Sequence, residues 1–343
     1  MSPSDRKLLK TIQGEVQQRP PAWMMRQAGR HLPEYRELRS RSRNFLDFCY
    51  SPSLAAEATL QPIRRYGMDG AILFADILLI LDAMGRKVEF VEGEGPRVQK
   101  IESSSDLDAV ALETVLDRLS PVYETVERVR GSLDHTTTLI GFAGAPWTVG
   151  VYALEGRGGT DKSSSRLWVY QNPEDCDRML EILAIATAGY LKRQADAGAD
   201  VLMLFDSWAE GLADDVFERI IIKPTQRVVS ELRAMGVRQP VIGFPRGCGV
   251  MIDAYARKST VQAVGLDTAV PPGWAHQALP EKMPVQGNLD PLLLVSGGPE
   301  LEKRVRSIAD AFSGRPHVFN LGHGILPNTP IEHVERVLAT LRG

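Results

Sequence analysis

VLMLFD, residues 201–206, is apolar at five successive positions and then ends in an aspartate. A strand with one face in water alternates apolar and polar residues, whereas a strand buried on both faces is apolar throughout. The stretch therefore predicts a strand of a parallel sheet that is covered on both sides. Seven other short runs share this character. In chain order they are AWMM (22–25), GAILFAD (70–76), TLIGFAG (138–144), PVIGF (240–244), VQAVGLD (261–267), PVQGN (284–288) and HVFNLG (317–322).

Helical patterns lie between most of these runs. The clearest starts at Asn172 and Pro173, which suit the N-cap and first helical positions, and Gly198 is suited to end it. Its apolar face consists of Met179, Leu183, Ala186 and Tyr190. A last helix is expected near the end of the sequence, where Thr329 and Glu332 match a capping box. Its apolar side consists of Ile331, Val334, Leu338 and Leu341.

Eight buried strands separated by helices predict a (β/α)8 barrel, the TIM-barrel fold of the α/β class. We expect a single domain over residues 1–343, with an active-site cleft at the C-terminal ends of the strands. A doubly wound open sheet is the main alternative. That fold usually carries a GxGxxG turn after its first strand, and RQAGRH (26–31) does not match it. The stretch GRKVEFVEGEGPRVQKI (85–101) predicts a hairpin inserted after the second strand.

Charge and cysteine content narrow the class of protein. Forty basic against forty-three acidic residues give a net charge of −3, so neither a nucleic acid nor an anionic membrane is the expected partner. The longest apolar run, AILFADILLILDAM (71–84), carries two aspartates and is too short to span a bilayer, and MSPSDRKLLK (1–10) has no apolar signal core. Cys49, Cys176 and Cys248 are isolated, without a CxxC pair, which favours a reducing compartment, with the cytoplasm as the default.

The stretch WMMRQAGRHLPEYRELRSRSR (23–43) is rich in arginine and contains no lysine. The guanidinium fork matches a carboxylate geometrically, so such a cluster favours a polycarboxylate ligand. Arg26 and Arg30 directly follow the first predicted strand, which places them at its C-terminal end. For Arg36, Arg41 and Arg43 the alternative is a solvated helix face that carries ion pairs with nearby glutamates.

Catalytic groups in a barrel come from the C-terminal ends of the strands and the loops that follow. Each candidate there also has a structural alternative. Asp76 and Asp206 could cap the next helix, Tyr152 could be a core residue, and His323 could be a structural histidine between two glycines. No nucleophile–base pair stands out, and HEXXH, HxC and GxxxxGK[ST] motifs do not occur. The strand-end candidates are Arg26, Gln27, Arg30, Asp76, Tyr152, Asp206, Ser207, Arg246 and His323.

Several motifs in colinear order resemble the uroporphyrinogen decarboxylase family over essentially the whole chain. The most specific is PAWMMRQAGRHLPEYRELR (21–39), which is similar to the N-terminal signature of the family. The others are FADILLILDAMG (74–85), GFAGAPWTVGVYALEG (141–156), FDSWA (205–209), VQGNLDP (285–291) and FNLGHGILPNTP (319–330). The resemblance implies a (β/α)8 barrel that usually forms a homodimer, in agreement with the strand count.

The resemblance also implies a reaction: four acetate side chains of uroporphyrinogen III lose CO2, which gives coproporphyrinogen III in haem biosynthesis. It implies neither a metal ion nor an organic cofactor. By motif, the catalytic roles fall to Asp76, Arg26 and Arg30. The residues expected to contact the substrate are Arg26, Gln27, Ala28, Gly29, Arg30, Arg39, Asp76, Tyr152, Ser207 and His323. The substrate is a polycarboxylate tetrapyrrole, which the arginine forks suit.

A decarboxylation without pyridoxal or thiamine needs another electron sink, and a pyrrole ring protonated on carbon is one. An ionised Asp76 is expected to accept hydrogen bonds from the pyrrole N–H groups and to stabilise the cationic ring. The group that delivers the proton stays unassigned. Two alternatives stay open. One is a zinc- or corrinoid-linked methyltransferase of the same superfamily, which normally needs cysteine and histidine ligands, and the other is a non-catalytic tetrapyrrole binder.

Overall fold

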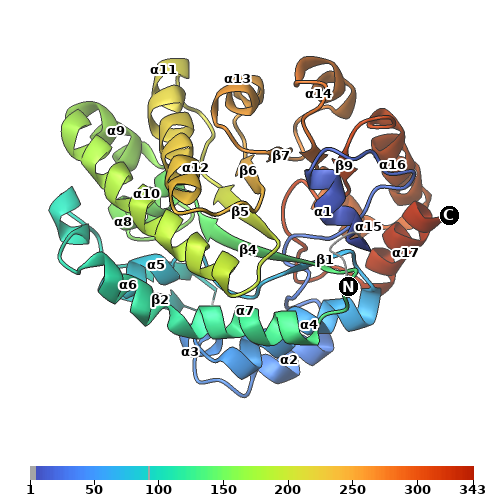
Figure 1. Ribbon diagram of the computed structural model, residues 1–343, viewed down its shortest axis with the longest axis horizontal. Coiled ribbons are helices and arrows are strands. Elements are labelled where there is room, and N and C mark those ends of the chain that lie inside the picture. Colours follow the sequence, from blue (N-terminus) through green and yellow to red (C-terminus); the bar gives the residue numbers. More distant parts are fainter. Residues whose placement is uncertain (1–4, 92) are drawn as a thin grey trace.

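The computed structural model describes residues 5–91 and 93–343, in which seven parallel strands form one sheet with helices around it (Figure 1). The strands pair in chain order, so that each of the five inner strands is hydrogen-bonded to the strand before and after it. Their bounds are β1 (Gly70–Ile72), β4 (Thr138–Gly144), β5 (Val201–Asp206), β6 (Val241–Pro245), β7 (Ala263–Gly265), β8 (Val285–Gln286) and β9 (His317–Val318). This arrangement is that of a TIM barrel, and the predicted fold class is confirmed.

The segment at residues 21–25 lies between β9 and β1 and closes the sheet. Ala22 forms a parallel bridge with Phe319, and its carbonyl accepts a hydrogen bond from the N–H just before β1 at 2.9 Å. The ladder stops there because the side chain of Asn320 accepts the hydrogen bond from the Met25 N–H, at 3.0 Å. The first predicted strand is therefore a single bridge, which occupies the eighth position of the barrel.

The continuous apolar character of the strands reflects burial on both faces. All seven residues of β4 are buried, and α10 (Pro173–Asp196) packs against its outer face. The helix predicted from Asn172 onward is confirmed, although the Asn172 side chain forms no capping bond at this N-cap. Gly198, two residues beyond the helix, has φ +116°, which glycine adopts without strain. The predicted apolar face is buried at Met179, Leu183, Ala186 and Tyr190.

The last predicted helix is confirmed as α17 (Ile331–Arg342), with Val334 and Leu338 buried. The capping box predicted for it is wrong. Pro330 takes the N-cap position, so Thr329 lies one residue too early, and its buried hydroxyl has no hydrogen-bond partner in the described part of the chain.

The predicted hairpin is also confirmed, as the antiparallel pair β2 (Val88–Val91) and β3 (Gly95–Val98). It is joined to the end of α8 (Pro146–Glu155), because the Val98 N–H donates to the Gly156 carbonyl at 2.8 Å. None of the described helices is both long and apolar enough to cross a bilayer. The other α-helices are α1 (Lys7–Ile12), α2 (Pro33–Arg39), α3 (Phe45–Cys49), α4 (Pro52–Tyr66), α5 (Leu79–Ala83), α6 (Leu112–Arg118), α7 (Ser120–Ser132), α9 (Ser163–Gln171), α11 (Asp214–Phe217), α12 (Lys223–Ala234), α13 (Met251–Lys258), α14 (Pro272–Ala278), α15 (Pro291–Ser296) and α16 (Gly298–Ala311).

Candidate active site

Arg26 follows the barrel-closing segment and has φ +61°, in the left-handed region that residues other than glycine rarely adopt. Its side chain crosses Gly324, where an added Cβ would come within 2.4 Å of Arg26 Cδ. Gly29 permits the turn that follows, because a Cβ there would lie 2.9 Å from the Arg26 carbonyl oxygen. A left-handed residue with a side chain costs about 1–2 kcal/mol, and such strain clusters at functional sites.

Arg26, Asp76 and His323 share the space beyond the C-terminal ends of the strands. Burial raises the pKa of Asp76 to about 6, while a hydrogen bond from the Leu78 N–H at 2.9 Å and the charge of Arg26 oppose the rise. The pKa of His323 is lowered to about 4, mainly by burial and in addition by the positive charges of Arg26 and Arg246. At pH 7 Asp76 is therefore mainly an anion, and His323 is a neutral imidazole.

Tyr152 lies on α8, where its ring centroid is 5.9 Å from that of Trp208. Burial and the negative charge of Asp76 raise the pKa of the Tyr152 hydroxyl to about 12, so it stays protonated at pH 7. Lys162 Nζ lies 4.1 Å from the centroid of the Trp208 ring and pairs with Glu210 Oε1 at 2.6 Å. The loop that carries Lys162 is thus bound to the loop after β5, beside Tyr152.

Asp206 is the last residue of β5 and is only 2% exposed. Its Oδ1 accepts a hydrogen bond from the Thr148 hydroxyl at 2.5 Å, and burial raises its pKa to about 7. Ser207, the next residue, is half-buried, and its carbonyl accepts a hydrogen bond from Arg246 Nη1 at 3.3 Å. Among the residues described, none is hydrogen-bonded to the Ser207 hydroxyl, which leaves this group free for a ligand.

Arg30 is exposed and Arg39 is half-buried, and both act on one buried tyrosine. Burial raises the pKa of Tyr35 to about 12, and the charges of Arg39 and Arg30 oppose this rise. The Arg39 guanidinium lies 6.0 Å from the ring centroid of Phe45 and 5.8 Å from that of Phe48. These aromatic contacts hold the Arg39 side chain of α2 against α3.

The arginine-rich segment divides into two groups. Arg41 and Arg43 form ion pairs with acidic residues four positions away, as expected of a solvated helix face. Arg36 was expected to do the same, but it donates to the Arg30 carbonyl at 2.7 Å and forms no ion pair within residues 5–91 and 93–343. In the same part of the chain no carboxylate lies within ion-pair distance of Arg26 or Arg30. Arg39 pairs with no carboxylate there either, but its Nη1 donates to the Ser42 carbonyl at 3.1 Å. Among the described residues, none is hydrogen-bonded to the side chains of Arg26 and Arg30, which leaves both guanidinium groups free to bind an anion.

Gln27 does not face the strand-end space with its side chain. It is fully buried, its amide N–H donates to the Gly70 carbonyl at 3.0 Å, and its amide oxygen accepts from the Met24 N–H at 3.1 Å. The side chain therefore joins the barrel-closing segment to β1. Ala28 is half-buried in the turn between Arg26 and Arg30.

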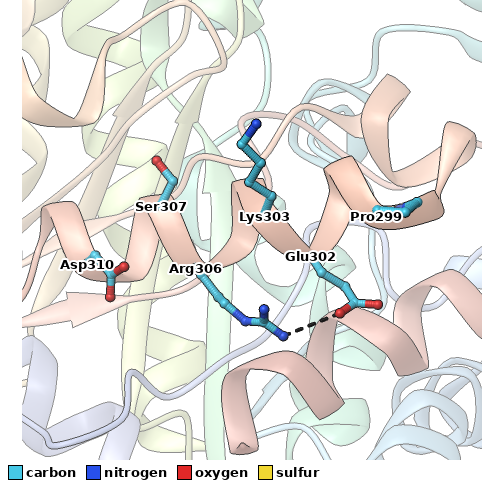
Figure 2. A pocket seen from close by; sticks show the side chains of 6 residues that line it. All are labelled: Pro299, Glu302, Lys303, Arg306, Ser307 and Asp310. Atoms are coloured by element: carbon cyan, nitrogen blue, oxygen red, sulfur yellow. Dashed lines mark hydrogen bonds and ion pairs between the residues drawn. The ribbon is translucent and has the colours of Figure 1, made fainter.

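Neither a metal cluster nor the groove along α16 marks another site. In the part of the chain that the structure describes, no three His, Cys, Asp or Glu side chains are arranged to hold a metal ion. A groove runs along α16, where Arg306 and Glu302 pair with each other at 3.3 Å (Figure 2). It is lined by Pro299, Glu302, Lys303, Arg306, Ser307 and Asp310. None of these belongs to the group of Arg26, Asp76, Tyr152 and His323, which we call the strand-end cluster.

The fold and the strand-end cluster define a TIM-barrel enzyme in which the free guanidinium of Arg26 lies near the half-buried carboxylate of Asp76. The sequence profile of the uroporphyrinogen decarboxylase (URO-D) family matches residues 3–343. This chain belongs to that family.

Relatives in the family match this chain over its full length. The chain is 61% identical over 342 residues to the uroporphyrinogen decarboxylase of Hyphomonas neptunium, an alignment that covers 100% of this chain and 99% of that protein. It is 52% identical over 335 residues to the enzyme of Maricaulis maris, with 98% and 97% covered. Among solved structures, a methyltransferase from Methanosarcina mazei has a TM-score of 0.81 at 19% identity, with 98% of each chain covered. That likeness shows the fold alone.

Sequence reasoning missed three side chains that surround the cluster: Trp208, Lys162 and Thr148. Trp208 lies in the FDSWA motif, and a tryptophan in a strand-end loop was a signal that could have found it. Lys162 pairs with a residue 48 positions away, and Thr148 bonds to one 58 positions away, so neither contact has a local signal.

Proposed function

We infer that this chain is the carboxy-lyase that removes CO2 from the four acetate side chains of uroporphyrinogen III and gives coproporphyrinogen III, in haem and other tetrapyrrole biosynthesis. The observation that carries this inference is family membership over essentially the whole chain, with relatives of that name at 52–61% identity. The strand-end cluster supports it as well. Free arginines suit the carboxylates of the substrate, and the half-buried anion of Asp76 suits its pyrrole N–H groups.

The cationic side of the site binds and orients the substrate. Arg26 and Arg30 take carboxylates as bidentate partners, each bond being worth about 1.5–3 kcal/mol, and Arg39 extends this surface. Ala28 and Gly29 contribute backbone to the turn between the first two. The Gln27 side-chain amide is bound within the fold and its backbone N–H donates to the Met24 carbonyl at 3.0 Å, so its backbone carbonyl is the group left to accept from the substrate.

The neutral side chains of the site donate hydrogen bonds without adding charge. The Tyr152 hydroxyl stays protonated because its pKa is about 12, and His323 stays neutral because its pKa is about 4. Together with the Ser207 hydroxyl they donate to carboxylate oxygens of the substrate.

Each decarboxylation consumes one proton and releases one CO2. Protonation of a pyrrole carbon makes the ring cationic, and the electrons of the acetate C–C bond then flow into the ring as CO2 departs. The methylene carbon gains a proton to become a methyl group, and the ring carbon loses the proton that it gained. Asp76 accepts hydrogen bonds from the pyrrole N–H groups and stabilises the cation, while Arg26 or Arg30 holds the departing carboxylate. The scheme requires neither a metal ion nor an organic cofactor.

The enzyme is proposed to act in the cytoplasm as a homodimer. All three cysteines are buried free thiols, which supports a reducing compartment. On α9, Leu167 is 54% and Tyr170 is 61% exposed, which supports a contact surface for a second copy. Light scattering during size-exclusion chromatography measures the mass, and a monomer at micromolar concentration would contradict the dimer.

Anaerobic incubation of the purified protein with uroporphyrinogen III, followed by chromatography of the products, tests the function. We expect stepwise loss of four carboxylates until coproporphyrinogen III accumulates, without added metal or cofactor. Stoichiometric binding of unchanged substrate would instead indicate a non-catalytic carrier. Stoichiometric zinc in active protein, together with methyl transfer, would indicate the methyltransferase chemistry.

A further inference from the structure

Arg246 directly follows β6, and three strand-end loops determine its position. Its backbone N–H donates to the Asp206 carbonyl at 3.0 Å, and Nη1 of its side chain donates to the Ser207 carbonyl at 3.3 Å. The next residue, Gly247, donates its N–H to Asp267 Oδ2 at 2.7 Å. The base and the tip of the side chain are thus both held by neighbouring loops.

The guanidinium of Arg246 shares the strand-end space with that of Arg26. The Arg26 side chain passes directly beside the residue after His323, since a Cβ on Gly324 would come within 2.4 Å of Arg26 Cδ. Burial and the charges of Arg26 and Arg246 together lower the pKa of His323 to about 4. Arg246 is half-buried, and within residues 5–91 and 93–343 no carboxylate lies within ion-pair distance of it. Because one N–H is bound to Ser207, the remaining donors of the fork are free for a ligand.

The barrel order places Arg246 across the site from the arginine-rich segment. Arg26, Arg30 and Arg39 all follow the barrel-closing segment, which lies between β9 and β1. Counted round the ring through β1, β4 and β5, β6 is four positions away from that segment, half of the eight. A macrocycle that carries acid groups all round its edge needs cations on opposite sides of the barrel mouth. The arginine-rich segment supplies cations on one of these sides only.

We propose that Arg246 binds a carboxylate of the tetrapyrrole substrate at the edge of the macrocycle opposite the carboxylates held by Arg26 and Arg30. This inference rests on the proposed function and adds a substrate-binding residue to it. Arg246 acts on affinity and not on the bond that breaks, because it touches a side-chain acid and not the pyrrole ring.

Three variants separate this role from simple bracing of the Ser207 loop. Arg246→Met removes both the charge and the donor, whereas Arg246→Gln removes the charge and keeps an N–H for the Ser207 carbonyl. Arg238→Met is the matched control, since Arg238 is an exposed arginine just before β6, at the other end of the same strand. The KM and kcat for uroporphyrinogen III are measured anaerobically at several salt concentrations, with a melting temperature for each variant.

Both Arg246 variants are expected to raise KM about 10–100-fold, with kcat within about threefold of wild type and a weaker dependence of KM on salt. The Arg238→Met control is expected to match wild type. An unchanged KM in Arg246→Gln, with a raised KM only in Arg246→Met, would show bracing alone and overturn the inference, as would unchanged KM in both. Wild-type protein that makes no coproporphyrinogen would overturn the proposed function itself, whereas active wild type with insensitive variants overturns only the role of Arg246. A variant that melts much earlier than wild type is replaced by Arg246→Lys, for which a KM raised at least threefold is expected and an unchanged KM counts against the inference.

Discussion

Asp76 and Asp206 lie at the C-terminal ends of two strands of one barrel, and burial raises the pKa of both, to about 6 and about 7. Their surroundings differ. Asp206 is 2% exposed and accepts its hydrogen bond from a neutral hydroxyl, that of Thr148. Asp76 is half-buried and accepts its hydrogen bond from the Leu78 N–H, with the charge of Arg26 nearby.

The difference teaches how a barrel uses one residue type in two ways. A carboxylate that is partly exposed and lies beside a cation keeps its charge available for a ligand. A carboxylate enclosed with a hydroxyl is costly to ionise, and its value lies in joining α8 to β5. Neither is a helix cap of the kind considered from sequence, since the N-cap of α5 is Leu78, and that of α11 is Ala213.

The largest expected effect is on kcat, which should fall when Asp76 is replaced but not when Asp206 is replaced. Asp76→Asn keeps the size of the side chain and removes the charge that stabilises the cationic ring, so kcat falls about 10²–10³-fold with a modest change in KM. Asp206→Asn is the matched control, and its kcat stays within a few-fold of wild type. Steady-state assays of both variants measure these kcat values. Equal losses of kcat in both variants would show that the two carboxylates do not differ in their roles.

The next largest effect is on the pH dependence of the stability of the folded protein, which should change when Asp206 is replaced. The pKa of Asp206 is about 7 in the folded protein, against 3.8 ordinarily. The buried neutral carboxyl therefore contributes its full stabilisation of the folded state below pH 4, and this contribution is lost as the pH rises through 7. Asp206→Asn cannot ionise. We therefore expect it to match wild type near pH 4 and to exceed it at pH 8, by on the order of 4 kcal/mol at most.

Denaturant unfolding at pH 4, 6 and 8 measures this difference. Thr148→Val serves as a control, because it leaves the carboxylate without its donor and should lower stability at pH 8 by about 1–3 kcal/mol. A stability gap between Asp206→Asn and wild type that does not grow with pH contradicts the assignment.

The smallest effect concerns the cation beside Asp76. Since kcat/KM reports groups of the free enzyme, its acid limb is expected near pH 6 in wild type, where Asp76 loses its charge. Arg26→Met removes a charge that lowers this pKa, so the limb should move upward by less than one pH unit, besides any loss of affinity. An unchanged limb would show that Arg26 does not act on Asp76, and a downward shift would contradict the sign assigned to its charge.

The sequence predicted the strands well and their lengths poorly. A continuous apolar run indicates which residues are buried, and burial continues beyond the residues that are hydrogen-bonded to a neighbouring strand. GAILFAD (70–76) contains β1 at Gly70–Ile72 only, and PVQGN (284–288) contains β8 at Val285–Gln286. The barrel-closing segment shows the same limit, because its ladder ends where a distant side chain, Asn320, takes over one backbone N–H. No local pattern carries that information.

The candidate site was predicted as far as position along a strand determines it. Arg26, Asp76 and His323 follow different strands, and parallel strands bring their C-terminal ends together, so their common location followed from the fold. Side-chain partners did not follow. Gln27 and Arg26 are neighbours in the same signature, yet the amide of one is bound to Gly70 inside the fold and the guanidinium of the other is free.

The left-handed backbone of Arg26 has a consequence for how this protein would respond to selection for heat resistance alone. Arg26→Gly relieves a strain of about 1–2 kcal/mol and costs about 0.5–1 kcal/mol in added freedom of the unfolded chain, so its net effect on melting is small or favourable. A library screened only for thermal survival would therefore retain enzymes that have given up this anion-binding group. Such a library has to be screened for activity as well, because selection for thermostability does not select for Arg26.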